Sequence, residues 1–231
     1  HAAFLDSKEY GSLTEPGVTL REVSALRHRM LTMHIFDPQT MKLDSLSDAL
    51  DAVDALSPLV DAAEMLLQKY DVVATNPPNM SALLAAFVKK EYPDSKSDLF
   101  AVFIERCRAF AKAGDYQAMI TQHAWMFLSS FEKLRMKLQS VDTQNMAHLG
   151  ARAFEEIGGE VVQTTSFVLR KNHVPGYKGT YVRLIEPTTQ QGKEDMFLAG
   201  ENRYTAQQDN FSKIPGAPVA YWVSGKFTAC F

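Results

Sequence analysis

The chain has 231 residues and a formal net charge of −3, and 46% of its residues are hydrophobic. These values are ordinary for a globular protein, and they exclude a fibrous repeat, a mainly disordered chain and a uniformly basic nucleic-acid binder. No apolar run approaches the roughly 20 residues that span a bilayer, so no membrane partner is expected. Two cysteines, Cys107 and Cys230, are too few for a disulfide framework or a zinc site and indicate a reducing, cytoplasmic setting.

Helices are predicted in the segment that precedes Asp71. Apolar residues recur at helical spacing over Thr19–Ile35, and a second helix is expected to begin at Ser45. Ser57-Pro58 is expected to restart the helix, which then runs to Tyr70, because a proline at the first helical position loses no hydrogen bond.

Beyond that segment, short β-branched runs alternate with amphipathic runs, which is typical of an α/β sheet with helices on both faces. The strands are expected to be buried. A Ser129-x-x-Glu132 capping box is expected to open one helix, and Gly114 to cap the end of another. In chain order, the predicted elements are a strand at Asp71–Thr75, helices at Ser81–Glu91 and Ser97–Ala113, a strand at Tyr116–Gln122 and a helix at Phe131–Leu138.

Two further strands are predicted in the C-terminal part of the chain. Glu160–Lys171 and Thr180–Ile185 are β-branched and flank a Pro-Gly loop, which indicates an antiparallel hairpin and therefore a mixed sheet. Periodicity is lost from Glu186 to Phe231, where three prolines fall. We therefore expect an α/β domain over 1–185 and a separate, irregular extension over 186–231.

The most informative segment is Asn76-Pro77-Pro78, directly after the first predicted strand. A Pro-Pro pair preceded by one named residue should occur by chance about 0.03 times in a chain of this length. Open α/β sheets bind ligands at the carboxyl ends of their strands. A rigid Asn-Pro-Pro at such an end presents the Asn76 amide together with carbonyls that have no neighbouring N–H to satisfy them. A loop that merely ends the strand, with Asn76 in an Asx-turn, is the alternative.

This motif resembles the Asn-Pro-Pro-Tyr motif of N6-adenine DNA methyltransferases. From about Asp71 onward, further segments resemble the large adenine methyltransferases of the BREX phage-defence systems, the PglX family. The resembling segments are Pro93–Phe100, Phe103–Arg106, Met119–Phe127, Ala147–Gly150, Thr164–Leu169, Ile214–Gly216 and Val219–Trp222.

The resemblance implies a Rossmann-like class I methyltransferase fold and methyl transfer from S-adenosylmethionine to the N6 of an adenine flipped out of double-stranded DNA. The setting would be phage defence or restriction-modification, with other phage-defence subunits as further partners. The catalytic motif would consist of Asn76, Pro77, Pro78 and Asn79. The Asn76 side chain and the Pro77 carbonyl would accept hydrogen bonds from the two N–H groups of the adenine amine. Asn76 would also border the cofactor.

The sequence departs from the family pattern at Asn79, where the family has a tyrosine whose ring holds the flipped base. Phe167 or Trp125 is expected to supply the missing stacking face. The alternative is that activity is weakened. The rival function, which Asn79 favours for the chain in isolation, is a non-catalytic DNA- or partner-binding module that retains the methyltransferase fold.

A second departure concerns the cofactor. None of the twelve glycines forms the Gly-x-Gly of the family's cofactor loop. Asp6 is either the family's acidic residue near the cofactor adenine or a helix cap. Because the chain also begins with His1, we expect a fragment that is incomplete in its N-terminal cofactor half and binds S-adenosylmethionine weakly in isolation.

Other candidate residues each have a plain alternative. His123, at the end of the second central strand, either lines the same pocket or is a structural histidine. Lys89-Lys90 and Arg170-Lys171 either touch phosphate or are surface charges in solvent.

Overall fold

The computed structural model describes residues 10–33, 43–78, 82–154 and 162–223. The chain forms two compact units, His1–Lys69 and Tyr70–Phe231, and each is described by itself. No helix in the described part of the chain combines the length and the hydropathy needed to cross a membrane.

The N-terminal unit is a helical pair that follows a short 3-10 turn, η2 (Gly11–Leu13). Helix α2 spans Leu20–Met33, close to the predicted bounds, and α3 spans Leu43–Leu67. Thr19 and Glu22 cap α2 reciprocally, since each side chain accepts a hydrogen bond from the other's backbone N–H. The two helices share a buried cluster of Val23, Met30, Val53, Val60 and Ala63.

The predicted restart at Ser57-Pro58 is wrong, because Pro58 lies inside the continuous helix α3. A proline in a helix interior removes one backbone hydrogen bond and crowds the preceding turn. Buried contacts on both sides of it, at Val53 and Val60, hold the helix together across this position. Tertiary packing therefore overrides the local signal for a break.

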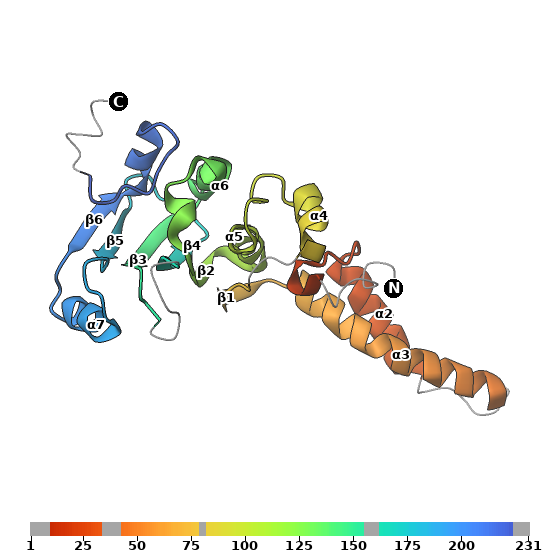
Figure 1. Ribbon diagram of the computed structural model, residues 1–231. Helices are drawn as coiled ribbons and strands as arrows, with labels where there is room; N and C mark the ends of the chain where they lie inside the picture. The colour runs from red at the N-terminus through yellow and green to blue at the C-terminus, as the bar shows by residue number, and fades with distance from the viewer. Residues whose placement is uncertain (1–9, 34–42, 79–81, 155–161, 224–231) are drawn as a thin grey trace. The chain divides into compact units, whose positions relative to one another are not determined.

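The second unit is built on a mixed six-stranded sheet in the order β1-β2-β4-β3-β5-β6, as Figure 1 shows. Its strands are β1 (Tyr70–Thr75), β2 (Ala111–Gln122), β3 (Asp142–Gly150), β4 (Thr164–Arg170), β5 (Lys178–Arg183) and β6 (Arg203–Gln207). The pairs β1·β2 and β3·β5 are parallel, whereas β4 runs antiparallel to both β2 and β3, and β6 antiparallel to β5. The mixed α/β sheet predicted from the sequence is confirmed.

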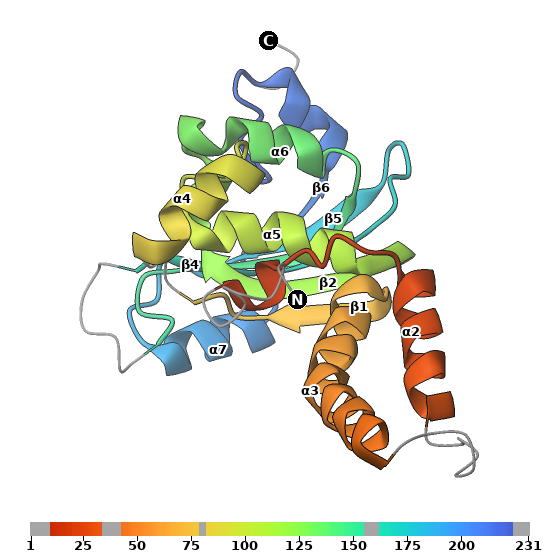
Figure 2. The same cartoon turned by 90° about the vertical axis from the view of Figure 1, so that its right-hand side faces the viewer.

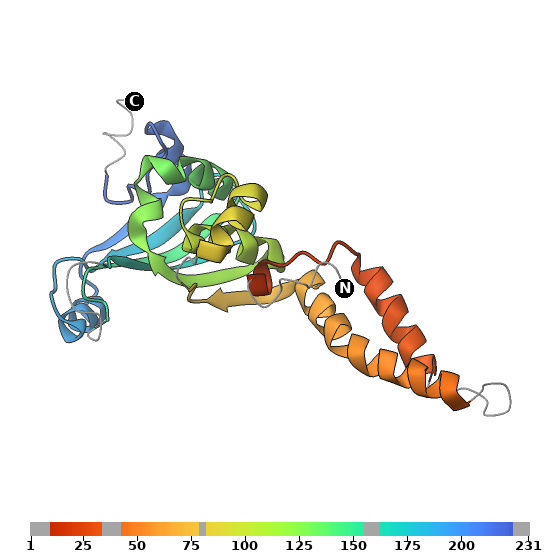
Figure 3. The same cartoon turned by 45° about the vertical axis from the view of Figure 1, so that its right-hand side comes forward.

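Helices cover both faces of this sheet. Its helical elements are α4 (Ala82–Glu91), α5 (Leu99–Phe110), η3 (His123–Met126), η4 (Ser129–Phe131), α6 (Glu132–Leu138), α7 (Gln190–Leu198) and η5 (Gln208–Lys213). Figures 2 and 3 place α4, α5 and α6 on one side of the sheet and α7 on the other. The main core joins α5 and α6 to the sheet through residues such as Ile104, Leu134, Met146 and Phe167.

The predicted hairpin between the two C-terminal strands is wrong. Strand β3, which the sequence reading missed, lies between β4 and β5 and pairs with both. The β3 segment carries many polar residues, so it lacks the apolar alternation that marks a strand. Buried partners satisfy these polar groups, as Gln208 does for Thr143.

Two local signals also led to wrong boundaries. Helix α5 ends at Phe110, and Gly114, with a φ of 87°, lies inside β2 where the register to β1 shifts. Gly114 is therefore a bulge residue and not a helix cap. Ser129 begins the 3-10 turn η4 instead of capping α6, whose N-cap is Phe131.

The expected boundary at residue 185 is also wrong, because the C-terminal segment completes the sheet and its core. Strand β6 pairs with β5, and Phe211, Val219 and Tyr221 belong to the main core cluster. These apolar residues are set in irregular backbone, so no periodicity reveals their burial. The division observed lies at Lys69/Tyr70 instead.

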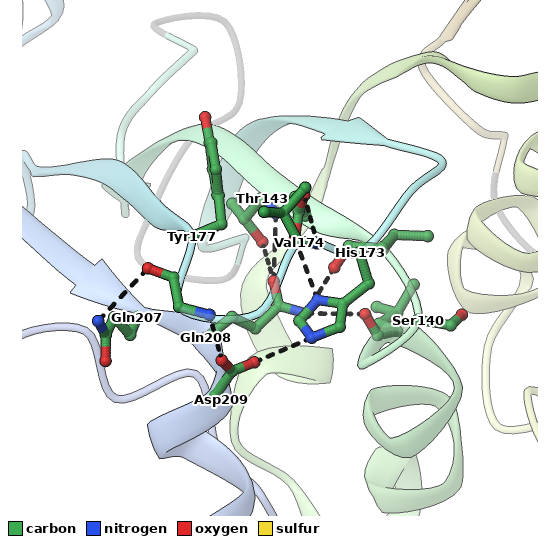
Figure 4. A network of polar contacts seen from close by, with 12 residues as sticks. Ser140, Thr143, His173, Val174, Tyr177, Gln207, Gln208 and Asp209 are labelled. Carbon is green, nitrogen blue, oxygen red and sulfur yellow. Dashed lines mark hydrogen bonds and ion pairs between the residues drawn. The ribbon is translucent and has the colours of Figure 1, made fainter.

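A polar network fastens this segment to the rest of the unit, as Figure 4 shows. Gln208 accepts from the N–H and hydroxyl of Thr143 and donates to the carbonyls of Leu138 and Val141 at 2.8 Å each. His173 lies between two carboxylates, with Nδ1 3.1 Å from Asp142 and Nε2 3.2 Å from Asp209.

Replacing Gln208 by leucine is expected to lower the free energy of unfolding by about 2–4 kcal/mol, because buried hydrogen-bonding groups lose their partner. Urea unfolding monitored by circular dichroism measures this loss. Gln207→Leu is the matched control, since Gln207 makes one long hydrogen bond to Gly176 at 3.3 Å. Equal losses in the two variants would contradict the prediction.

Candidate active site

A cavity of about 360 Å³ opens at the carboxyl ends of β1 and β2. These strands are parallel, so the residues that follow them reach the same edge of the sheet. Asn76, Pro77 and Pro78 come from the end of β1, and Thr121 and Gln122 from the end of β2. The prediction that Asn76 and Pro77 line a concave site at the end of the Asp71–Thr75 strand is confirmed.

The other walls come from α5 and from the chain on either side of the β3–β4 connection. Asp98 is the N-cap of α5, and its carboxylate accepts a 2.6 Å hydrogen bond from the Leu99 N–H. Thr121 is fixed by the indole N–H of Trp125, which donates to its hydroxyl at 3.1 Å. The remaining lining residues are Phe100, Ile120, Phe154, Val162 and Thr164. The cavity thus combines apolar walls with a few fixed polar groups, as small-molecule sites do.

Neither aromatic residue expected to stack on a base faces this cavity. Trp125 is 2% exposed and Phe167 is 1% exposed. Their rings pack edge to face in the core, with centroids 5.2 Å apart. Because a stacking platform needs an open ring face, the structure contradicts this role for both residues. Residue type suggested them, but the sequence could not show their burial.

Phe154 is the aromatic side chain that the sequence reading missed. It is 39% exposed and lines the cavity. It lies in the connection that leaves the carboxyl end of β3, which is where the strand-end rule directs attention. Because the sequence does not predict β3, the rule does not point to this connection. Asp6 and Asn79 fall outside the described residues.

Strand β1 is less buried than predicted. Within the described part of the chain it pairs only with β2, and Val72 is 60% exposed. It is therefore an edge strand here, with one row of backbone groups outside the ladder.

His123 does not line the cavity and has the structural role that was its alternative. Its Nδ1 lies 2.7 Å from Nε2 of His148, whose Nδ1 lies 3.0 Å from the Tyr221 hydroxyl. Burial lowers the pKa of His123, and burial together with the charges of His123, Arg183 and Lys193 lowers the pKa of His148 to about 4.

This histidine pair predicts a loss of stability in mild acid. In the unfolded chain the pKa of His148 is the ordinary histidine value of about 6.5, so between pH 6.5 and 4 the unfolded state binds more protons than the folded state. The free energy of unfolding should therefore decrease as the pH is lowered from 6.5 to 4, by on the order of 2–3 kcal/mol. Urea unfolding at several pH values measures the slope. His148→Gln should flatten it, and an unchanged slope in that variant would contradict the assignment.

The basic pairs are not at the cavity. Lys89 and Lys90 are exposed, and Lys90 forms an ion pair with Glu91. Arg170 and Lys171 donate to the backbone carbonyls of Gly114 and Ala111, near the beginning of β2. The cavity lies at the other end of that strand, so neither pair contributes to its walls.

Comparisons with known proteins agree with the motif. Residues 24–154 match the family model described as Eco57I restriction-modification methylase. The chain is 44% identical to a Lacticaseibacillus casei (strain Zhang) protein named adenine-specific methyltransferase PglX, covering 95% of this chain and 19% of that protein. It is 41% identical to the adenine-specific methyltransferase BrxX of Escherichia coli O9:H4 (strain HS), covering 78% of this chain and 16% of that protein.

These matches confirm the resemblance inferred from the Asn-Pro-Pro motif, and the chain spans less than a fifth of the length of both relatives. Among solved structures, a nuclease-deletion mutant of the Type ISP restriction-modification enzyme LlaGI, in complex with a DNA substrate mimic, matches with a TM-score of 0.49 at 11% identity. That match covers 71% of this chain and 19% of the other.

Proposed function

Because the chain belongs to the Eco57I restriction-modification methylase family, we propose that it carries the target-base site of an adenine-N6 DNA methyltransferase of phage defence or restriction-modification. The observation that supports this most strongly is the position of Asn76-Pro77-Pro78, at the carboxyl end of β1 and in the wall of a cavity. The substrate would be double-stranded DNA with one adenine turned out of the helix.

The proposed chemistry depends on two hydrogen-bond acceptors. The adenine amine is a poor nucleophile because its lone pair is delocalised into the ring. The Asn76 side-chain oxygen and the Pro77 carbonyl would accept hydrogen bonds from its two N–H groups and stabilise the positive charge that develops on nitrogen. The two prolines fix the backbone at this point, so little conformational freedom is lost when the amine binds.

The stacking face proposed for the base is Phe154. Its ring is the aromatic side chain of the cavity that keeps substantial exposure, whereas Phe100 is 5% exposed and belongs to the core. Base–aromatic stacking contributes about 1–3 kcal/mol per base. Phe154 would thus take over the role that the family tyrosine performs where this chain has Asn79.

The described residues fit the part of the reaction that holds the methyl-accepting base, next to the methyl group of S-adenosylmethionine. When bound, S-adenosylmethionine supplies an electrophilic methyl group. Asn76 would border it, and the volume of the cavity is in the range of known small-molecule sites. Asp6 remains the candidate for contact with the cofactor adenine.

The function is tested by incubating the protein at its full natural length with labelled S-adenosylmethionine and DNA, followed by nucleoside analysis. We expect labelled N6-methyladenine. DNA binding without any labelled base would contradict the proposal and favour the non-catalytic binding module.

A further inference from the structure

Lys193 belongs to helix α7, which lies on the side of the sheet opposite α5 (Figure 2). Its side chain is buried, with the residue 4% exposed. The ammonium donates to two backbone carbonyls, those of Leu149 and Leu184, at 2.7 Å each. Burial lowers the pKa of this ammonium, because removing a charged group from water is costly even where carbonyls accept its hydrogen bonds.

The two carbonyls mark the ends of two neighbouring strands. Leu149 is the penultimate residue of β3, and Leu184 directly follows β5. The Leu184 N–H in turn donates to the carbonyl of His148 at 2.8 Å. Figure 1 shows α7, which carries Lys193, beside these strand ends. Lys193 therefore clamps the carboxyl ends of β3 and β5 together.

The chain that leaves this clamp leads to the cavity. Gly150 has a φ of 65°, and a Cβ there would lie 2.9 Å from Cγ2 of Ile185. Arg152 also has a positive φ, of 57°. The turn begins next to Leu149, whose carbonyl is fixed by the hydrogen bond from Lys193. It leads the backbone to Phe154 in the cavity wall. Gly150 also pairs with Thr164, where the connection returns to the sheet and again lines the cavity.

We propose that Lys193 is a positioning residue for the target base, because it fixes the turn that presents Phe154 to the cavity. This inference rests on the proposed function, since it assigns the partner of Phe154 as an adenine. Lys193 itself contacts no substrate. Its effect on base binding is transmitted through the Leu149 carbonyl and the Gly150 turn.

A double-mutant cycle tests the coupling. In the full-length protein, Lys193→Met removes both hydrogen bonds of the ammonium and keeps the approximate length of the side chain. It should weaken binding of DNA carrying 2-aminopurine at the target position about tenfold when Phe154 is present. It should weaken binding less than twofold when Phe154 is already alanine. Equal losses in both backgrounds would overturn the proposal, because a general structural defect does not depend on Phe154.

Hydrogen exchange gives a readout that needs no substrate. The backbone amides of 150–154 should exchange faster in Lys193→Met, whereas Gln191→Ala, an exposed change on the same helix, should leave them unchanged. Unchanged exchange in Lys193→Met would also overturn the proposal. If Lys193→Met does not fold, Lys193→Gln, which keeps one donor group, replaces it in both measurements. Failure of the wild-type protein to form N6-methyladenine would defeat the proposed function instead, and the exchange result is independent of that outcome.

Discussion

In the full-length protein, replacing Asn76 by alanine is expected to lower the proposed adenine methylation rate by roughly 10²–10³, the range observed when one electrostatic stabiliser of a transition state is lost. Asn76 follows the end of β1 and lines the cavity, where its side-chain oxygen would accept a hydrogen bond from an N–H group of the reacting amine. The turnover rate should fall more than the affinity for DNA, because the acceptor matters most once charge develops on nitrogen.

Labelled methyl incorporation into DNA at saturating substrate measures this effect. Asn145→Ala is the matched control, since Asn145 is exposed on β3 and does not line the cavity. Near-normal incorporation by the Asn76 variant would remove Asn76 from the mechanism. A comparable fall in the Asn145 variant would show that the effect is not specific to the site.

Replacing Phe154 by alanine is expected to weaken binding of a flipped adenine by about 1–3 kcal/mol, or roughly 5- to 150-fold. The physical reason is the loss of the ring face in the cavity wall. Phe154→Tyr should restore most of the binding, whereas Phe154→Leu, which keeps apolar bulk without a ring, should restore little. Fluorescence titration with 2-aminopurine DNA measures the affinities.

Phe197→Ala provides the matched control for this prediction. Phe197 has nearly the same exposed fraction, 40%, but lies on α7 and does not line the cavity. Equal binding by the Phe154 variants and the wild type would mean that another group holds the base.

The sequence predicted the position of the Asn-Pro-Pro motif more accurately than the walls of the cavity around it. Asn76 and Pro77 could be placed because a proline pair ends a strand unambiguously and the strand-end rule then locates the site. Phe154 could not be placed, because it depends on β3, whose polar residues are satisfied by distant partners such as Gln208. Such pairings are tertiary and leave no local periodicity in the sequence.

The same limit explains the other differences. Phe167 and Trp125 have the right chemistry for stacking, but only the packed structure shows that their rings are buried against each other, edge to face. Pro58 and Gly114 carry strong local signals, for a helix start and a helix end, that packing and strand pairing override. Local propensity is a weak constraint when a buried cluster or a ladder decides the backbone.

The antiparallel pairing of β3 with β4 has a consequence for how this site can diverge. Because the two strands are neighbours, the chain between Gly150 and Thr164 leaves and re-enters the sheet at the same edge, and both anchors are paired to each other. Doubling the length of such a loop raises its closure free energy by only about 0.6 kcal/mol. The connection between β3 and β4 can therefore accept insertions and substitutions while β1 and the Asn76 that follows it keep their place in the sheet. The part of the cavity wall that this connection supplies, which includes Phe154, can therefore change in sequence without a change in the strands that carry the rest of the site.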